Sequence, residues 1–182
     1  RQDISVIGIA GPGDPMCDAD KTLATFEKCK SHFPNALLCL STNGLALPEH
    51  VDEIVRLGVS HVTVTVNAVT PDVGSKVYSW VRYEDKNYYG EEAARILLAR
   101  QDEGIRKLKE AGMLVKINTV VIPGVNMDHV RSISAKAKQW GADIMNCMAM
   151  IPVHDTPFEN LKSPSSDEIH RIRRSIGGDI EQ

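Results

Sequence analysis

Five short runs of apolar, β-branched residues recur along the chain, and a segment with helical character follows each of them. The runs cover residues 4–10, 36–40, 61–66, 114–122 and 143–151. The strands that these runs predict are apolar on both faces, which is typical of a parallel sheet buried under helices. The pattern therefore predicts an α/β fold with about five β/α units.

The segments between the runs carry helix-start and helix-stop signals. Asp18 or Asp20 can cap the first helix, and Ser165 or Ser166 can begin the last one. Helices are expected over residues 18–32, 48–57, 91–111, 128–140 and 165–177. The long segment 67–90 lacks such a pattern, and we predict a loop there that serves function or faces a partner.

Right-handed crossovers between parallel strands lead to either a doubly wound sheet or an incomplete barrel. Five units are too few to close an eight-stranded barrel. We therefore predict an open, partial barrel. Because no linker composition and no repeat interrupt the chain, residues 1–182 are expected to form one domain.

The composition excludes several classes of partner. A net charge of −3 in 182 residues gives no electrostatic reason to expect a nucleic acid or a membrane surface. No apolar run approaches the length of a membrane span, and no signal peptide is evident. The start at Arg1, directly before a strand, is typical of a fragment.

The chain has four cysteines, and no two of them have the CxxC spacing of zinc or thioredoxin motifs. A domain of this size does not need disulfides, so we expect reduced thiols and a cytoplasmic location. Cys29 and Cys147 are expected to be packing residues, while the role of Cys17 stays open.

Polar or turn-forming residues follow the ends of successive strands, where parallel β/α folds bind their ligands. Each group alone is an ordinary turn, but together they favour a polar ligand. After the first two strands they are Gly11, Pro12, Gly13, Asp14, Ser41 and Asn43. After the later strands they are Asn67, Asn118 and the Pro123–Gly124 turn, and the fifth strand ends with Met148, Met150 and Pro152.

Common catalytic motifs do not match these turns. No lysine follows the glycine turn at phosphate-loop spacing, and Pro15 stands where a dinucleotide motif needs its third glycine. No GxSxG elbow is present. Four histidines fall on expected helices and are predicted to be solvated, namely His32, His50, His129 and His170. His61 begins a strand away from the ligand end, which leaves His154 as the histidine with a possible site role.

The ordered set of motifs resembles the NifB family of nitrogenase cofactor biosynthesis proteins, which are radical S-adenosylmethionine (SAM) enzymes. The motifs are AGPGDP at 10–15, LCLSTNGL at 38–45, TVTVNAV at 63–69, WVRY at 80–83 and VKINTVVIPG at 115–124. Each motif is weak by itself, but the set covers nearly the whole chain in order.

This resemblance implies a partial (β/α)6 barrel that holds SAM on a [4Fe–4S] cluster. It implies an enzyme that builds the carbide-containing iron–sulfur precursor of the nitrogenase cofactor from two [4Fe–4S] clusters, with SAM as the carbon source. Cofactor carrier or scaffold proteins of nitrogenase assembly are the expected partners.

The resemblance also assigns residues to SAM. The 10–15 turn would meet the SAM ammonium through backbone carbonyls, and Ser41 and Asn43 would bond its ribose or carboxylate. Asn67 and Asn118 would share the same opening. An ammonium needs carbonyl acceptors and a carboxylate needs donors, so these residue types suit the ligand.

Adenine would lie against the Ile122 turn and the strand that carries Met148. Cys39 resembles a ligand to one substrate cluster, because iron–sulfur sites use thiolates. Strand alternation places Cys39 and Ser41 on one face. Arg82 can offset the charge of an anionic cluster or can bond a surface carboxylate, and the sequence leaves both interpretations open.

The CxxxCxxC loop of radical SAM enzymes does not occur in these residues, and neither does a cysteine-rich C-terminal segment. We therefore expect the isolated chain to be inactive. Two other hypotheses stay open: another radical SAM enzyme, of the molybdenum-cofactor or peptide-modifying type, and a β/α scaffold without chemistry. The scaffold hypothesis predicts a buried, metal-free Cys39.

Overall fold

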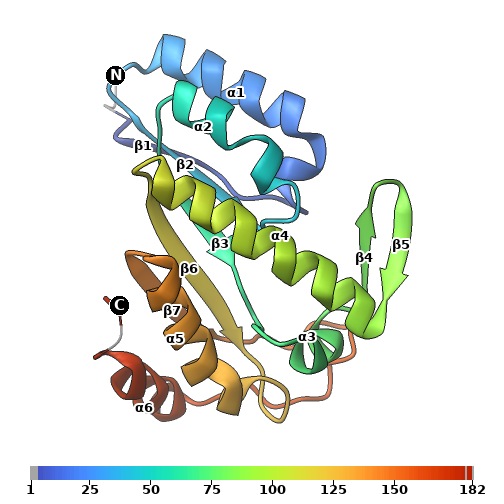
Figure 1. The fold of residues 1–182 in the computed structure, drawn as a ribbon. Helices are drawn as coiled ribbons and strands as arrows, with labels where there is room; N and C mark the ends of the chain where they lie inside the picture. Colours follow the sequence, from blue (N-terminus) through green and yellow to red (C-terminus); the bar gives the residue numbers. More distant parts are fainter. Residues whose placement is uncertain (1–3, 179, 182) are drawn as a thin grey trace.

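A parallel five-stranded sheet forms the centre of the structure, and its strands stand in the order in which they occur along the chain (Figure 1). The strands are β1 (Val6–Ile9), β2 (Leu37–Thr42), β3 (Val59–Thr65), β6 (Leu114–Val121) and β7 (Ile144–Ala149). This computed structural model describes residues 4–178, 180 and 181. Arg1, on which the expectation of a fragment start rests, lies outside the described residues. All five predicted strands are confirmed.

Helices connect these strands, and the last helix follows β7. They are α1 (Ala19–His32), α2 (Val51–Arg56), α4 (Gly90–Glu110), α5 (Val130–Trp140) and α6 (Ser166–Ile176), with 3-10 turns η1 (Pro15–Asp18), η2 (Leu47–Glu49) and η3 (Met127–His129). Asp18 caps α1 by accepting from Lys21 N, and Ser165 caps α6 in a capping box with Glu168. None of the helices described is long and apolar enough to cross a bilayer.

The strand order places the connecting helices on one face of the sheet. A right-handed crossover to the next strand always returns on the same side, provided that the strand order never reverses. A doubly wound sheet requires such a reversal. The sheet β1-β2-β3-β6-β7 has none, so the structure is the predicted partial barrel. The opposite face corresponds to the barrel interior.

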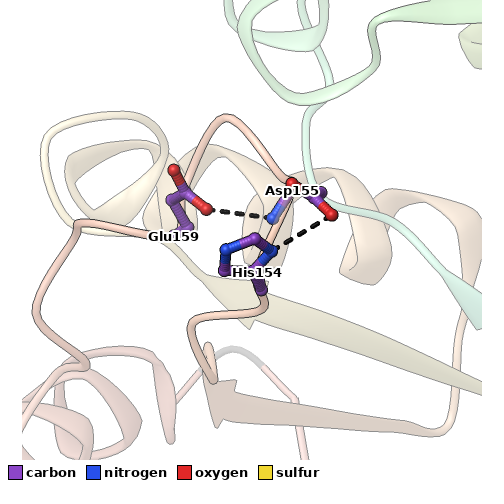
Figure 2. Close-up of side chains that lie close together, drawn as sticks. All are labelled: His154, Asp155 and Glu159. Atoms are coloured by element: carbon purple, nitrogen blue, oxygen red, sulfur yellow. Dashed lines mark hydrogen bonds and ion pairs between the residues drawn. The ribbon is translucent and has the colours of Figure 1, made fainter.

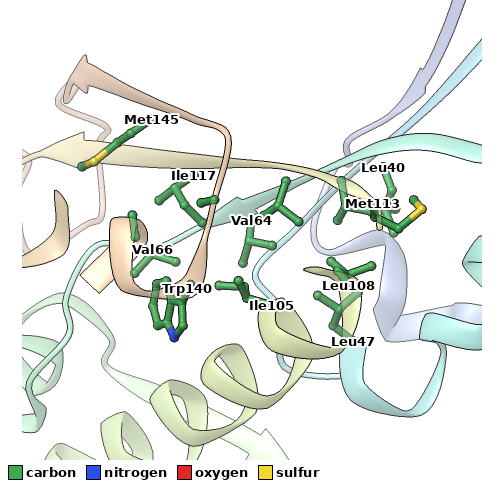
Figure 3. Packing of buried hydrophobic residues seen from close by; sticks show 14 of the residues in the cluster. Leu40, Leu47, Val64, Val66, Ile105, Leu108, Met113, Ile117, Trp140 and Met145 are labelled. Atoms are coloured by element: carbon green, nitrogen blue, oxygen red, sulfur yellow. The ribbon is translucent and has the colours of Figure 1, made fainter. Parts of the chain in front are cut away.

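Burial alternates along each strand and distinguishes the two faces. Leu38 and Leu40 of β2 are fully buried under the helices. Cys39 and Ser41, which alternate with them along the strand, are partly exposed. Figure 3 shows the core between the sheet and α4, where strand residues such as Val64 meet helix residues such as Leu108. We call the other, partly exposed surface the open face of the sheet.

The prediction that residues 67–90 form a loop is wrong, because this segment contains a helix and a β-hairpin. The helix is α3 (Pro71–Val77), and the hairpin pairs β4 (Trp80–Tyr83) with β5 (Lys86–Tyr89) and projects from the N-terminal end of α4 (Figure 1). Glu84 and Asp85 have positive φ, as tight two-residue hairpin turns require. Val81 is buried against Ala93 and Leu97 of α4, which ties the hairpin to the domain.

Asp102 joins α4 to α5. Its carboxylate accepts a hydrogen bond of 2.9 Å from the Trp140 indole and forms ion pairs with Lys136 at 2.9 Å and Arg106 at 2.8 Å. Burial alone raises the pKa of this carboxyl, but the bonds from Trp140, Lys136 and Arg106 outweigh it and lower the pKa to about 2.

Asp102→Asn should therefore lower the free energy of unfolding at pH 7 by about 1–2 kcal/mol, since the charge-dependent part of these contacts is lost. The folded-state pKa is lowered, so the charge stabilises the fold above the unfolded value of about 3.9. The difference between wild type and variant should shrink as the pH falls from about 4 to about 2. Urea unfolding across this range measures it, with the exposed Asp128→Asn as control. A difference that does not change with pH would contradict this role of the charge.

Candidate functional site

The turn after β1 can form only with glycine at its first position. Gly11 has φ +127° and Gly13 has φ +76°. A Cβ added to Gly11 would lie 2.9 Å from the Gly13 carbonyl oxygen, closer than real contacts allow. The Gly11–Pro12 peptide is cis. Asp14 ends the turn, and its carboxylate accepts from Met16 N at 2.9 Å.

The carboxylate of Asp14 joins this turn to the loop after β2. The Thr42 hydroxyl lies 2.9 Å and 3.1 Å from its two oxygens, and the backbone N–H of Asn43 donates to it as well. The Asn43 side chain accepts from Leu45 N at 2.8 Å, which shapes the same loop. The two strand-end turns are therefore one hydrogen-bonded unit.

Gln101 holds the second loop from beneath. This α4 side chain is fully buried, and its Nε2 donates to the carbonyls of Asn43 at 2.7 Å and Thr65 at 3.0 Å. Gly44, at φ +87°, lets it approach, since a Cβ there would lie 3.0 Å from Gln101 Cγ. Sequence reasoning missed Gln101, although an uncharged polar residue on the apolar side of a long helix is a usable signal.

A cavity of about 280 Å³ lies where these turns meet. It is lined by Ala10, Gly13, Asp14, Ser41, Thr42, Asn43 and Thr65. Four of the residues singled out from the sequence are therefore brought together, and Gly11 and Pro12 belong to the same turn. Thr65 is an additional lining residue that the sequence reasoning did not name.

The open face next to this cavity is polar. Ser41 pairs with Thr63, and Thr63 pairs with Lys116. Two residues further along these strands, Thr65 pairs with Asn118. The Oδ1 atom of Asn118 is buried and accepts no hydrogen bond from the described residues. A buried acceptor without a donor costs about 1–3 kcal/mol, so this atom is suited to a ligand N–H.

Asn67 and Ile122, by contrast, have structural bonds in this fold. The Asn67 side chain accepts from Val120 N at 2.9 Å, and Ile122 is only 4% exposed. Asn126 joins both: it accepts from Ile122 N at 2.7 Å and donates to the carbonyls of Asn67 and Val120, each at 2.9 Å. Sequence reasoning also missed Asn126, which fixes the end of β6.

Met148 lies on the open face of β7. It pairs with Val120 of β6 and is partly exposed, whereas its neighbour Cys147 is fully buried on the core side. A flexible thioether beside Val120 offers an apolar wall next to the polar rows. Its position is compatible with contact to a flat, apolar ligand group.

Cys39 lies on the open face of β2, and His61 of β3 is its neighbour. Cys39 Sγ lies 3.6 Å from His61 Nδ1, and both side chains are partly exposed. Burial raises the pKa of the Cys39 thiol. His61 is thus at the N-terminal side of the sheet, as expected, but it contacts the one cysteine that sequence reasoning assigned to a metal.

A match to a family model identifies the family to which this fold belongs. The profile of the Radical SAM superfamily matches residues 3–137. The chain belongs to the radical SAM superfamily. This superfamily uses SAM and [4Fe–4S] clusters.

Curated relatives narrow the resemblance. The chain is 40% identical over 174 residues to the FeMo cofactor biosynthesis protein NifB of Chlorobaculum tepidum, covering 96% of this chain and 41% of the relative. It is 45% identical over 179 residues to NifB of Sinorhizobium fredii, covering 96% and 36%. With NifB of Klebsiella pneumoniae the identity is 44% over 180 residues, covering 97% and 38%. The chain thus spans 36–41% of the length of these relatives. The resemblance to NifB predicted from the motifs is confirmed.

A solved structure supports the fold. It is the radical S-adenosylmethionine methyltransferase TsrM from Kitasatospora setae, with cobalamin and a [4Fe-4S] cluster bound. The TM-score is 0.53 at 17% identity, over 81% of this chain and 28% of TsrM. This likeness concerns the fold alone and agrees with a partial barrel.

The other three cysteines of this radical SAM domain lie apart from the cavity lining. Cys29 is partly buried and packs against the core, and Cys147 is fully buried in it, as predicted. Burial raises the pKa of Cys147 to about 11, so this thiol stays protonated. Cys17 is exposed on η1, directly after the glycine turn.

Arg82 and His154, whose roles the sequence left open, both lie at the surface. Arg82 pairs with the exposed Asp85 at 3.1 Å in the hairpin turn. His154 lies 3.1 Å from Asp155, and these two with Glu159 bring ligand atoms within 4.8 Å of one another (Figure 2). All three side chains are exposed, and a Glu159 oxygen already accepts from Asp155 N at 2.9 Å.

The expectation that His129 is a solvated surface residue is wrong. His129 is partly buried at η3, and its Nε2 accepts a hydrogen bond of 3.1 Å from Val69 N. Burial lowers the pKa of the ring, in agreement with a neutral acceptor. The His129 side chain points inward at the start of the helix, because it accepts the backbone N–H of Val69 in the segment after β3.

Asp14→Ala should loosen the two turns, because Thr42 and the backbone of Asn43 lose their acceptor. We expect the free energy of unfolding to fall by about 1–3 kcal/mol, the cost of unpaired donors at a partly buried carboxylate. Chemical denaturation measures this change. Glu27→Ala, an exposed carboxylate of α1, is the control and should stay within about 0.5 kcal/mol of wild type. Equal stability of the Asp14 and Glu27 variants would rule out the joining role of Asp14.

Proposed function

We propose that this chain is the SAM-binding core of an enzyme that builds the iron–sulfur precursor of the nitrogenase FeMo cofactor. The observation that carries the proposal is the placement of one polar cavity, formed by strand-end turns, on the same open face as the Cys39 thiol. The identity to NifB proteins over 96–97% of the chain supports the choice among radical SAM activities.

The donor and acceptor groups around the cavity fit the amino-acid end of SAM. Among the described residues, no donor bonds the carbonyls of residues 11–13, which leaves these oxygens for an ammonium. Asn118 Oδ1 is a further acceptor without a partner. Ser41 offers a hydroxyl, and Asn43 keeps its amide N–H groups because only its oxygen is used within the loop. A carboxylate or a ribose needs such donors.

The other residues singled out from the sequence extend this site. Adenine would lie along the apolar pair Val120 and Met148, next to the Ile122 turn. Asn67 would act indirectly, by fixing the ends of β3 and β6. In this superfamily, SAM is cleaved while it is bound to a [4Fe–4S] cluster. Here SAM would also supply the carbon of the precursor.

Cys39 would bind one of two [4Fe–4S] substrate clusters. Its thiol is disfavoured as a thiolate by burial, and iron is the type of partner that stabilises the thiolate. These 182 residues have no CxxxCxxC motif, so the chain alone is expected to be inactive.

An iron–sulfur product must pass to another protein without exposure to oxidants. Cofactor carrier or scaffold proteins of nitrogenase assembly are the partners that this function requires, and reduced thiols favour a cytoplasmic setting. The chain's net charge of −3 gives no support for a nucleic-acid partner.

Asn118→Leu should weaken SAM binding about tenfold, because a leucine of similar volume removes the unpartnered acceptor. The measurement is equilibrium dialysis of SAM with the complete gene product after reconstitution with iron and sulfide. Asn87→Leu on the exposed hairpin is the matched control and should bind like wild type. If both variants bind SAM with wild-type affinity, Asn118 does not contact the ligand.

Cys39→Ala should lower the iron content of the reconstituted complete protein by about four atoms per chain, the content of one [4Fe–4S] cluster. Cys147→Ala and Cys17→Ala remove a buried and an exposed thiol outside the site and should leave the iron content unchanged. Iron retained in full by Cys39→Ala would favour the scaffold hypothesis, in which Cys39 carries no metal.

A further inference from the structure

A β-bulge lies next to Cys39 in the pairing of β2 with β3. Leu38 pairs with Val59, but the next residue, Cys39, pairs with His61, so that Ser60 is an extra residue in β3. Bulges in parallel sheets are rare, and they re-aim side chains next to functional sites.

The bulge changes which side chain of β3 meets Cys39. Without it, regular pairing would place Ser60 opposite Cys39. Val59 and Val62 are both buried on the core side although they are three residues apart, which shows the shift in alternation. The consequence is that the His61 imidazole lies beside Cys39, with 3.6 Å between Nδ1 and Sγ.

Ser60 determines where the proton of the imidazole lies. The Ser60 hydroxyl donates its single hydrogen to the Leu38 carbonyl at 2.8 Å. His61 Nδ1 lies 3.0 Å from the same hydroxyl oxygen, which therefore can only accept. Nδ1 must carry a hydrogen, and that N–H is shared between the Ser60 oxygen and the Cys39 sulfur.

We propose that His61 is a positioning residue of the iron–sulfur site: its Nδ1–H donates a hydrogen bond to the sulfur with which Cys39 binds a cluster. This inference rests on the proposed function of Cys39. Because Nδ1 holds a proton, it is a donor to the sulfur and does not itself ligate iron. Hydrogen bonds to cluster sulfurs tune the reduction potential. By stabilising the more negative, reduced state, this bond should raise the potential of the cluster at Cys39.

The tautomer can be measured without a cluster. The full chain labelled with ¹⁵N-histidine is examined by NMR at about pH 9, where free imidazole is neutral. His61→Asn identifies the His61 signals by their loss. We expect the Nδ1–H tautomer at His61, and Ser60→Ala should shift these signals because it removes the oxygen that shares the proton. An Nε2–H tautomer at His61 would overturn the proposal.

The reduction potential then tests the role of the bond in the reconstituted complete protein. His61→Leu removes the donor and should shift the midpoint potential downward for the cluster signal that Cys39→Ala abolishes. His61→Asn places an amide N–H at the position of Nδ1 and should restore most of the shift. His61→Gln is the control, since its amide lies one bond further out, and should resemble His61→Leu. Urea unfolding of each variant confirms that it is folded.

The outcomes separate the two proposals. If Cys39→Ala keeps all iron, the proposed function of Cys39 fails, and this inference fails with it. If Cys39→Ala loses a cluster but His61→Leu and His61→Asn both keep the wild-type potential, only the role of His61 is overturned.

Discussion

The handedness of β/α crossovers is the constraint on which the rest of this structure depends. Because the strands follow one another in chain order, every right-handed crossover returns on the same side, and the helices cover one face of the sheet. The other face remains a polar inner wall that carries Cys39, Ser41, Thr63, Lys116 and Asn118. A sheet whose order reversed would have covered this wall with helices and would have moved the ligand site to the reversal point.

Buried and partly buried side chains with hydrogen bonds to backbone groups set the geometry of the cavity before any ligand arrives. Asp14 holds the first two turns together, Gln101 holds the carbonyls of Asn43 and Thr65, and Asn126 holds the ends of β3 and β6. These side chains already form hydrogen bonds within the protein. The groups left for a ligand are therefore backbone carbonyls of the glycine turn and a few unpaired atoms such as Asn118 Oδ1.

The deeper part of the open face has a separate arrangement, in which one inserted residue in β3 brings an imidazole to a thiol. The polar cavity and this thiol share one wall of a radical SAM domain.

The sequence by itself determined the parallel sheet, the helix starts near residues 18–20 and 165–166, and the convergence of the GPGDP and STNG turns, because these depend on local periodicity and turn chemistry. It predicted a loop where the hairpin over residues 80–89 lies, because the stability of this hairpin comes from packing of Val81 on α4. Only the tertiary structure decided the contacts of Gln101, Asn126, His129 and His61. Each joins segments far apart along the chain or depends on a bulge, and hydrogen-bond partners of this kind leave no periodic signal in a sequence.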